Sequence, residues 1–198
     1  MTPADTCRHM MTASGHEVDL RYPQVNSITL ADVAHHLAML NRFCGATRRP
    51  YSVAEHSLLV LEICERTMRL DVHGRLAALM HDAHDAYTQD VSTPAKAEIG
   101  EGWAHFEGRL ERTVRAAFAL HGAAHRWAAE IKQADLIALA TEKAQLLPAT
   151  GTLWPVLVEV RVMLLLLFLL RIDFLDHGVQ DFCARTGSRG QAAGRRSP

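Results

Sequence analysis

Several signals that would assign this chain to a familiar class are missing from its 198 residues. None of its four cysteines lies in a CxxC pair, which excludes a zinc knuckle or a disulfide framework and favours reduced thiols. The formal net charge is −1, so no overall basic field points to nucleic-acid binding. The most apolar run, VMLLLLFLL at 162–170, is far shorter than the roughly 20 residues that a membrane-spanning helix needs. We therefore expect a buried element there, no membrane partner and no polymeric nucleic acid.

Both ends of the chain also have few structural signals. The first residues, MTPADTCRHMM, show no basic start followed by an apolar stretch, so they predict no secretory signal, and we expect a cytoplasmic protein. Residues 186–198, TGSRGQAAGRRSP, are rich in Gly, Ser and Arg and offer little to bury, which predicts a disordered tail.

Strand signals are scarce as well, because no run of alternating β-branched residues is bounded by hairpin turns. The repeated apolar spacing is three and four, which is typical of helices. The sequence therefore predicts an all-α fold, a compact helical bundle with one domain at 27–150. Residues 1–26 form an expected N-terminal extension, and residues 151–185 an expected C-terminal extension that packs on the domain.

The first two expected helices flank a polar connector, GATRRPY. A helix that begins at Ser27 or Thr29 should run through LADVAHHLAMLNRF and end near Gly45. The second begins at Ser52, and its sequence SVAEHSLLVLEICERTM places His56 on an apolar face, so the imidazole should point into the core. That face also carries Leu59, Val60, Ile63 and Cys64.

The next expected helix begins at Gly74 and reads RLAALMHDAHDAYTQ. His81 and Asp85 follow Ala77 at a spacing of four, so polar groups continue its buried face. The segment DVSTPAK should be a loop, because Pro94 lacks an amide hydrogen and restricts the residue before it.

Two further amphipathic helices complete the expected bundle. In the second, HRWAAEIKQADLIALATEKAQLL, Asp135 lies at a spacing of four from both Ile131 and Leu139 and should face inward. The first has an expected apolar stripe of Trp103, Phe106, Leu110, Val114 and Phe118.

Three separate segments thus place a metal-binding side chain on an apolar face: His56, then His81 with Asp82, then Asp135. Burying the carboxylates unpaired would cost several kcal/mol each, so they need a cation or strong donors. One divalent metal would satisfy all four residues, and this ligand set suits Mn, Fe, Co, Ni or Zn, with Mg also compatible. The alternative is that the histidines are satisfied core residues and the aspartates are caps or surface groups.

The order of these residues resembles that of the HD-domain metal-dependent phosphohydrolases. The likeness runs through YSVAEHS, ALMHDAHDAYTQDVSTPAK and KQADLIALATE, over roughly residues 27–148. It points to the small bacterial and phage branch with 5'-deoxynucleotidases and deoxyadenosine triphosphate triphosphohydrolases. The resemblance implies a helical HD-type domain with a metal site between helices, and by analogy a homodimer. Its implied metal ligands are His56, His81, Asp82 and Asp135.

The resemblance also implies catalytic roles. Asp85 stands where that branch usually has a Glu that orients or deprotonates the attacking water, and its side chain is one methylene shorter. Asp90 matches an acidic position that protonates the leaving group. His84 is additional, and three interpretations stay open: it supplements proton transfer, it binds a second metal, or it packs.

Substrate contacts are expected from side chains outside the metal site. Arg42 and Phe43 resemble an arginine–aromatic pair of the deoxynucleotidases, in which the arginine contacts phosphate and the ring packs on the sugar. Lys96 and Thr93, in STPAK, are further candidates, because phosphate needs fixed cations and donors. Alternatively, Arg42 only forms an ion pair, Phe43 belongs to the core and Lys96 is solvated.

The leading hypothesis is hydrolysis of a (deoxy)nucleotide phosphate ester by a metal-activated water, with a small-molecule nucleotide as partner. A 5'-deoxynucleotidase, which releases phosphate from a dNMP, is favoured over a dNTP triphosphohydrolase. A cyclic-nucleotide or alarmone phosphodiesterase and a non-catalytic metal- or nucleotide-binding module are further alternatives. The chain contains no Ser-His-Asp elbow or glycine-rich phosphate loop that would suggest another chemistry.

Overall fold

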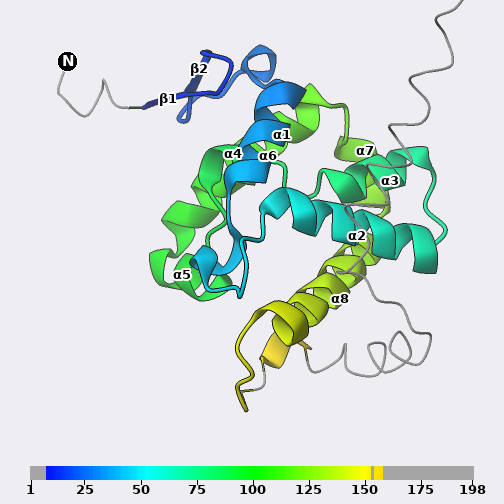
Figure 1. Ribbon diagram of the computed structural model, residues 1–198. Helices are drawn as coiled ribbons and strands as arrows, with labels where there is room; N and C mark the ends of the chain where they lie inside the picture. Colours follow the sequence, from blue (N-terminus) through cyan, green and yellow to red (C-terminus); the bar gives the residue numbers. More distant parts are fainter. Residues whose placement is uncertain (1–7, 153, 158–198) are drawn as a thin grey trace, which may run out of the picture.

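The computed structural model describes residues 8–152 and 154–157, which form a helical bundle with one short two-stranded sheet (Figure 1). The predicted all-α fold class is confirmed. The domain boundaries at residues 26 and 150 stay predictions. The expected extension at 151–185 lies mostly outside the described residues, and the apolar run at 162–170 and the tail at 186–198 lie wholly outside them.

A hairpin that the sequence did not predict precedes the helices. β1 (His9–Met11) pairs antiparallel with β2 (Glu17–Asp19), and the 3-10 helix η2 (Val25–Ser27) follows. The hairpin is tied to the first helix by the buried Asp32, which accepts hydrogen bonds of 2.8 Å from both the amide and the hydroxyl of Ser14. Burial opposes the charge on Asp32, but donors from Thr29 and Ser14 outweigh it and lower its pKa to about 2.

The first helix, α1 (Leu30–Met39), begins at its capping residue Thr29 as expected but ends well before Gly45. The chain at Leu40 turns extended instead, and its carbonyl accepts a 2.9 Å hydrogen bond from the amide of Val53. The short 3-10 helix η3 (Arg42–Gly45) follows, and in it Phe43 and Cys44 adopt left-handed φ values of 55° and 51°. Non-glycine residues rarely adopt this backbone, which cannot continue an α-helix.

Helix α2 (Val53–Thr67) is central to the bundle and packs against α3 (Val72–Leu79) and α8 (Ala128–Leu146). A capping box between Ser52 and Glu55 fixes its start. The predicted buried face is confirmed, and its apolar members each contribute roughly 1.5–3 kcal/mol when fully buried. The buried residues of this face are His56, Leu59, Val60, Ile63 and Cys64.

The predicted continuous helix from Gly74 is wrong, because two helices separated by a turn take its place. Helix α3 starts earlier, where the Asp71 side chain accepts the Gly74 amide, and ends at Leu79. Residues 80–84 form a turn before the short α4 (Asp85–Thr88). Gly74 itself allows the Trp127 ring to approach, since a Cβ atom there would lie 2.7 Å from ring atoms.

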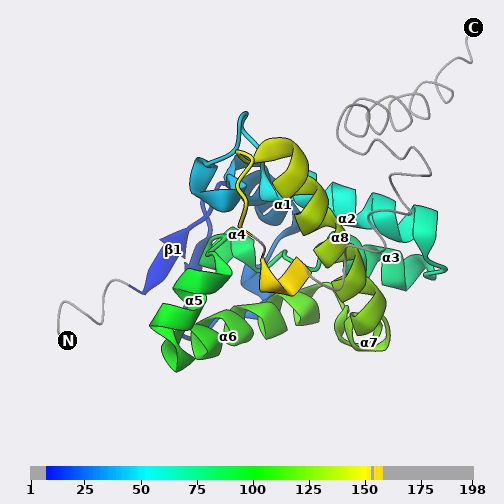
Figure 2. The same ribbon diagram turned by 90° about the horizontal axis from the view of Figure 1, so that it is seen from below.

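The predicted loop DVSTPAK is also wrong in its second half, because Thr93 starts helix α5 (Thr93–Ile99). Pro94 lies in the first turn, where an amide hydrogen has no helical partner in any case. Helices α6 (Glu101–Ala117) and α7 (His121–Arg126) lie along one side of the bundle (Figure 2). The expected stripe on α6 buries Leu110 and Val114 and half-buries its three aromatic residues.

The 3-10 helix η4 (Pro155–Leu157) packs on the end of α8. Among the described residues, no helix is both long enough and apolar enough to cross a membrane.

Candidate metal centre

The turn after α3 places the predicted metal ligands His81 and Asp82 next to His56 on α2. The ligand atoms of His56, His81 and Asp82 all lie within 4.8 Å of one another, so this group could hold a metal ion. His81 Nε2 is 3.2 Å from Asp82 Oδ2, and His56 Nε2 is 3.5 Å from the same oxygen. Asp135 approaches from α8, with Oδ1 3.4 Å from His56 Nε2. The four residues named from the sequence therefore meet at one place.

Both imidazoles are oriented by acceptors at their Nδ1 atoms. His56 Nδ1–H donates to Glu142 Oε1 at 2.6 Å, and His81 Nδ1–H donates to the Ala78 carbonyl at 2.9 Å. Each neutral ring then presents an unprotonated Nε2, and the two Nε2 atoms are only 3.3 Å apart. Two lone pairs at this separation need a cation between them, which is either a proton or a metal ion.

Glu142 also belongs to this site, although it was not predicted from the sequence. It is fully buried on α8, and its Oε1 also accepts a 3.0 Å hydrogen bond from the Tyr51 hydroxyl. Its other oxygen lies 3.4 Å from Arg42 Nε. A signal was available, because Glu142 follows Asp135 by seven residues and therefore lies on the same face of α8.

The charges of this cluster act strongly on one another. Burial and the charge of Arg42 both act to lower the pKa of His56, but Glu142, Asp135 and Asp82 outweigh them and raise it well above its usual value. Burial opposes the charge on Asp82, yet its two histidine neighbours hold its pKa well below the usual range. A proton on His56 is thus the cation that the carboxylates retain when no other cation is bound.

The two predicted proton-transfer residues lie next to this group. Burial and the nearby charge of Asp82 raise the pKa of Asp85 to about 7. Asp90 is partly buried, its pKa is also raised by burial, and its Oδ1 lies 3.8 Å from a terminal nitrogen of Arg42. Both carboxyl groups are therefore easier to protonate than exposed aspartates.

A second group that could hold a metal ion consists of His84, Asp85 and Glu107. His84 Nε2 is 3.6 Å from Asp85 Oδ1 and 3.6 Å from Glu107 Oε1. Here, however, Lys96 forms a short hydrogen bond to that same Glu107 oxygen. The nearby His84 imidazole and the hydrogen bond from Lys96 lower the pKa of Glu107 to about 2. The protein therefore supplies a cation to this group from its own chain.

The predicted substrate contacts have mixed positions. Arg42 is buried, and its backbone amide donates a hydrogen bond to the Tyr51 carbonyl. A terminal nitrogen of its guanidinium lies 3.7 Å from Asp82 Oδ2. Phe43 is half-buried, and its ring centroid lies 6.3 Å from that of Trp154. Thr93 is exposed at the start of α5.

Beside the metal-ligand group lies a cleft of about 240 Å³, which is lined in part by His81, Asp82 and Asp135. Its charged lining also includes Glu111 and Arg115 from α6 and Lys132 from α8. None of the four predicted substrate-contact residues lines this cleft. Its apolar walls are formed by Ala77, Met80, Leu120, Ala124, Ala128 and Ile131.

Comparison with known proteins identifies two relatives. No family model matches the chain. An uncharacterized protein of Rhodobacter capsulatus is 43% identical over 110 residues, which cover 54% of this chain and 56% of that protein. The uncharacterized protein YfdR of Escherichia coli is 33% identical over 138 residues, which cover 69% of this chain and 72% of YfdR. The chain thus spans little more than half the length of the first relative.

Proposed function

The chain belongs to the same family as YfdR, and we propose that it is a metal-dependent phosphohydrolase of the HD-domain type. Its proposed substrate is a (deoxy)nucleotide phosphate ester, and its proposed reaction is that of a 5'-deoxynucleotidase, dNMP to deoxynucleoside and phosphate. Since the relatives are uncharacterized, the proposal rests on the residues of this chain.

The observation that carries the proposal is the pair of facing Nε2 atoms of His56 and His81, 3.3 Å apart. Ligands about 2.1 Å from a shared ion and at right angles to each other are roughly 3 Å apart, so this spacing suits one ion. Both Nδ1 atoms are already engaged by acceptors, which is the usual outer support of a metal-binding histidine. The donor set of two imidazoles and two carboxylates favours Mn, Fe, Co, Ni or Zn.

When bound, a divalent ion supplies Lewis acidity, which activates water as a nucleophile and offsets the negative charge that develops on phosphoryl oxygens. The side chains of the protein supply orientation and proton transfer. Asp85, with a pKa of about 7, is suited to accept a proton from the attacking water near neutral pH. Asp90, whose pKa is raised, is suited to return a proton to the leaving oxygen.

The alternatives share much of this chemistry. A dNTP triphosphohydrolase would use the same ligands and differ in which phosphorus is attacked. The second group, His84, Asp85 and Glu107, is the feature that would favour a dinuclear phosphodiesterase, but Lys96 already offsets its charge. A non-catalytic binding module would keep the metal site without turnover.

The test is release of phosphate or triphosphate from all four dNMPs, dNTPs and their ribose counterparts. The protein is stripped with EDTA and reloaded with Mn, Co, Zn or Mg, and a His81→Ala, Asp82→Ala double variant serves as control. We expect metal-dependent phosphate release from at least one dNMP and none from the control. No release from any substrate, in protein shown to bind metal, would contradict the proposal.

A further inference from the structure

The cleft beside the metal-ligand group raises the question of which cations meet a substrate there. Arg42 does not line the cleft, and its guanidinium is already surrounded by the carboxylates of Asp82, Asp90 and Glu142. Lys96 does not line it either and is bound to Glu107. Both predicted phosphate contacts therefore lie outside the lining of the cleft.

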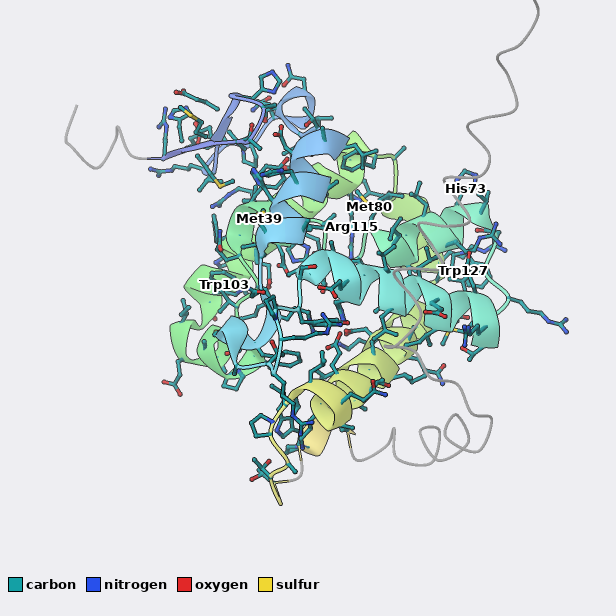
Figure 3. All side chains as sticks on the ribbon, in the orientation of Figure 1. Met39, His73, Met80, Trp103, Arg115 and Trp127 are labelled. Atoms are coloured by element: carbon teal, nitrogen blue, oxygen red, sulfur yellow. The ribbon has the colours of Figure 1, made fainter. Side chains whose placement is uncertain are left out.

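Two other cations do line the cleft, on different helices. Arg115 projects from α6 and Lys132 from α8, and the cleft runs between them. Arg115 is labelled in Figure 3, where it lies next to Met80, another residue of the cleft wall. Lys132 is one helical turn from the predicted metal ligand Asp135, so a phosphate held at the metal would be within its range.

Both cations are paired in a way that leaves them able to bind a ligand. Arg115 contacts Glu111, and Lys132 contacts Asp135, so each partner lies one turn away on the same helix. The side chains of Arg115 and Lys132 are 37% and 64% exposed, and their acidic partners Glu111 and Asp135 are 31% and 20% exposed. Ion pairs between neighbouring turns of one helix at such partly exposed positions are weak. A phosphate group can therefore compete with Glu111 for Arg115 and with Asp135 for Lys132, and both of these carboxylates also line the cleft.

We propose that Arg115 and Lys132 form the phosphate-binding pair of this site and hold the substrate phosphate in the cleft. The inference rests on the proposed function, since it takes the ligand to be a phosphate ester. The apolar walls at Leu120, Ala124 and Ala128 then face the nucleoside part of the substrate. Arg115 and Lys132 thus bind what is common to all nucleotides, the phosphate, and not a particular base.

The experiment is calorimetric titration of the manganese-loaded protein with inorganic phosphate, a probe that requires no turnover. Arg115→Met and Lys132→Met should each weaken phosphate binding about 10- to 100-fold, the loss expected for a charge-assisted hydrogen bond. The matched control is Arg112→Met, on the same helix but exposed and outside the cleft lining, which should bind phosphate as the wild type does. Manganese affinity is measured for every variant, because Lys132 contacts the predicted metal ligand Asp135 and its loss could alter metal binding as well as phosphate binding.

Three results would overturn the inference. The first is wild-type affinity for phosphate in Arg115→Met and Lys132→Met, and the second is no phosphate binding by the wild type. The third is an Arg115→Met variant that binds phosphate as the wild type does but hydrolyses the four dNMPs in a different order of preference, which would assign Arg115 to the base. Phosphate binding that depends on both cations, without hydrolysis of any nucleotide, would instead contradict the proposed function and leave this inference standing.

Discussion

Two polar clusters lie side by side in this bundle, and they solve the same electrostatic problem differently. The first, around His56, His81 and Asp82, contains four carboxylates, of which three contact His56 and the fourth contacts Arg42. Among the described residues, its only cationic side chains are Arg42 and Lys132. With neutral histidines, two negative charges remain unbalanced. These carboxylates are Asp82, Asp90, Asp135 and Glu142.

The second cluster, His84 with Asp85 and Glu107, has its own cation in Lys96. Moreover, the raised pKa values of His84 and Asp85 favour uptake of a proton, and one added proton makes the group with Lys96 neutral. The comparison teaches that two groups with similar ligand atoms can differ in charge balance, and charge balance is the basis on which we propose the first as the metal site. What distinguishes the first cluster is a deficit of about two positive charges together with two Nε2 atoms that face each other.

The largest expected effect comes from removing a ligand of the first cluster. Asp82→Asn should abolish metal-dependent hydrolysis and weaken manganese binding at least about 100-fold, because one of the few anionic ligands is lost. Metal content and calorimetric affinity measure it. Glu107→Gln is the matched change in the second cluster and should leave the affinity for the metal at the wild-type value. Equal losses in the two variants would erase the distinction between the clusters.

Glu142→Gln should have the next largest effect. The amide can still accept from His56 Nδ1–H, but it no longer carries the charge that makes the imidazole a better ligand, so metal affinity should fall about 10- to 100-fold. Tyr51→Phe is the control, since it removes only the second hydrogen bond to Glu142 Oε1. Circular dichroism verifies folding. Unchanged affinity in Glu142→Gln would mean that this carboxylate serves packing alone.

Asp85 allows the second cluster to be tested through pH. Its pKa in the folded protein, about 7, lies above the usual 3.8, so the unfolded chain loses this proton first as pH rises. The wild type therefore loses stability between about pH 4 and pH 7 through this group. In metal-free protein, Asp85→Asn should raise the free energy of unfolding by roughly 2–4 kcal/mol at about pH 8.

The same Asp85→Asn variant should show almost no difference from the wild type near pH 4, where both side chains are neutral. Urea titrations at the two pH values give the comparison. A stability difference of the same size at both pH values would contradict the raised pKa of Asp85 in the folded protein.

The smallest effect is expected at Lys96. Lys96→Met removes a partly buried ion pair with Glu107, so the protein should lose about 1 kcal/mol of stability. Metal affinity should not change, because the first cluster does not use this cation. Thermal unfolding and metal titration of the same preparation measure both quantities. A strong loss of metal binding would indicate that the two clusters act as one site.

Periodicity was enough to predict part of this arrangement. The apolar spacing along α2 places His56 inside, and the sequence pattern also named His81, Asp82 and Asp135, which the fold brings together. The positions of His56 and Asp135 follow from local helical geometry, which a sequence displays directly. His81 and Asp82 lie in the turn at residues 80–84, so helical spacing does not explain their placement.

Features of the site that depend on tertiary contacts were not predicted from the sequence. The helix expected to continue through His81 is broken after Leu79, where the His81 ring takes the Ala78 carbonyl as its acceptor. Arg42 reaches the site through an extended segment and a strained turn at Phe43, neither of which shows in the apolar pattern. Glu142 has the right spacing, but its partners come from elsewhere in the chain and are seen only once it is folded.

The most direct test of the account is a crystal structure of the manganese-loaded protein with anomalous diffraction data. We expect one anomalous peak per chain, between the Nε2 atoms of His56 and His81 and in contact with Asp82. A peak in the second cluster, at His84 and Glu107, or no peak in protein saturated with manganese, would contradict the claim that the first cluster is the metal site.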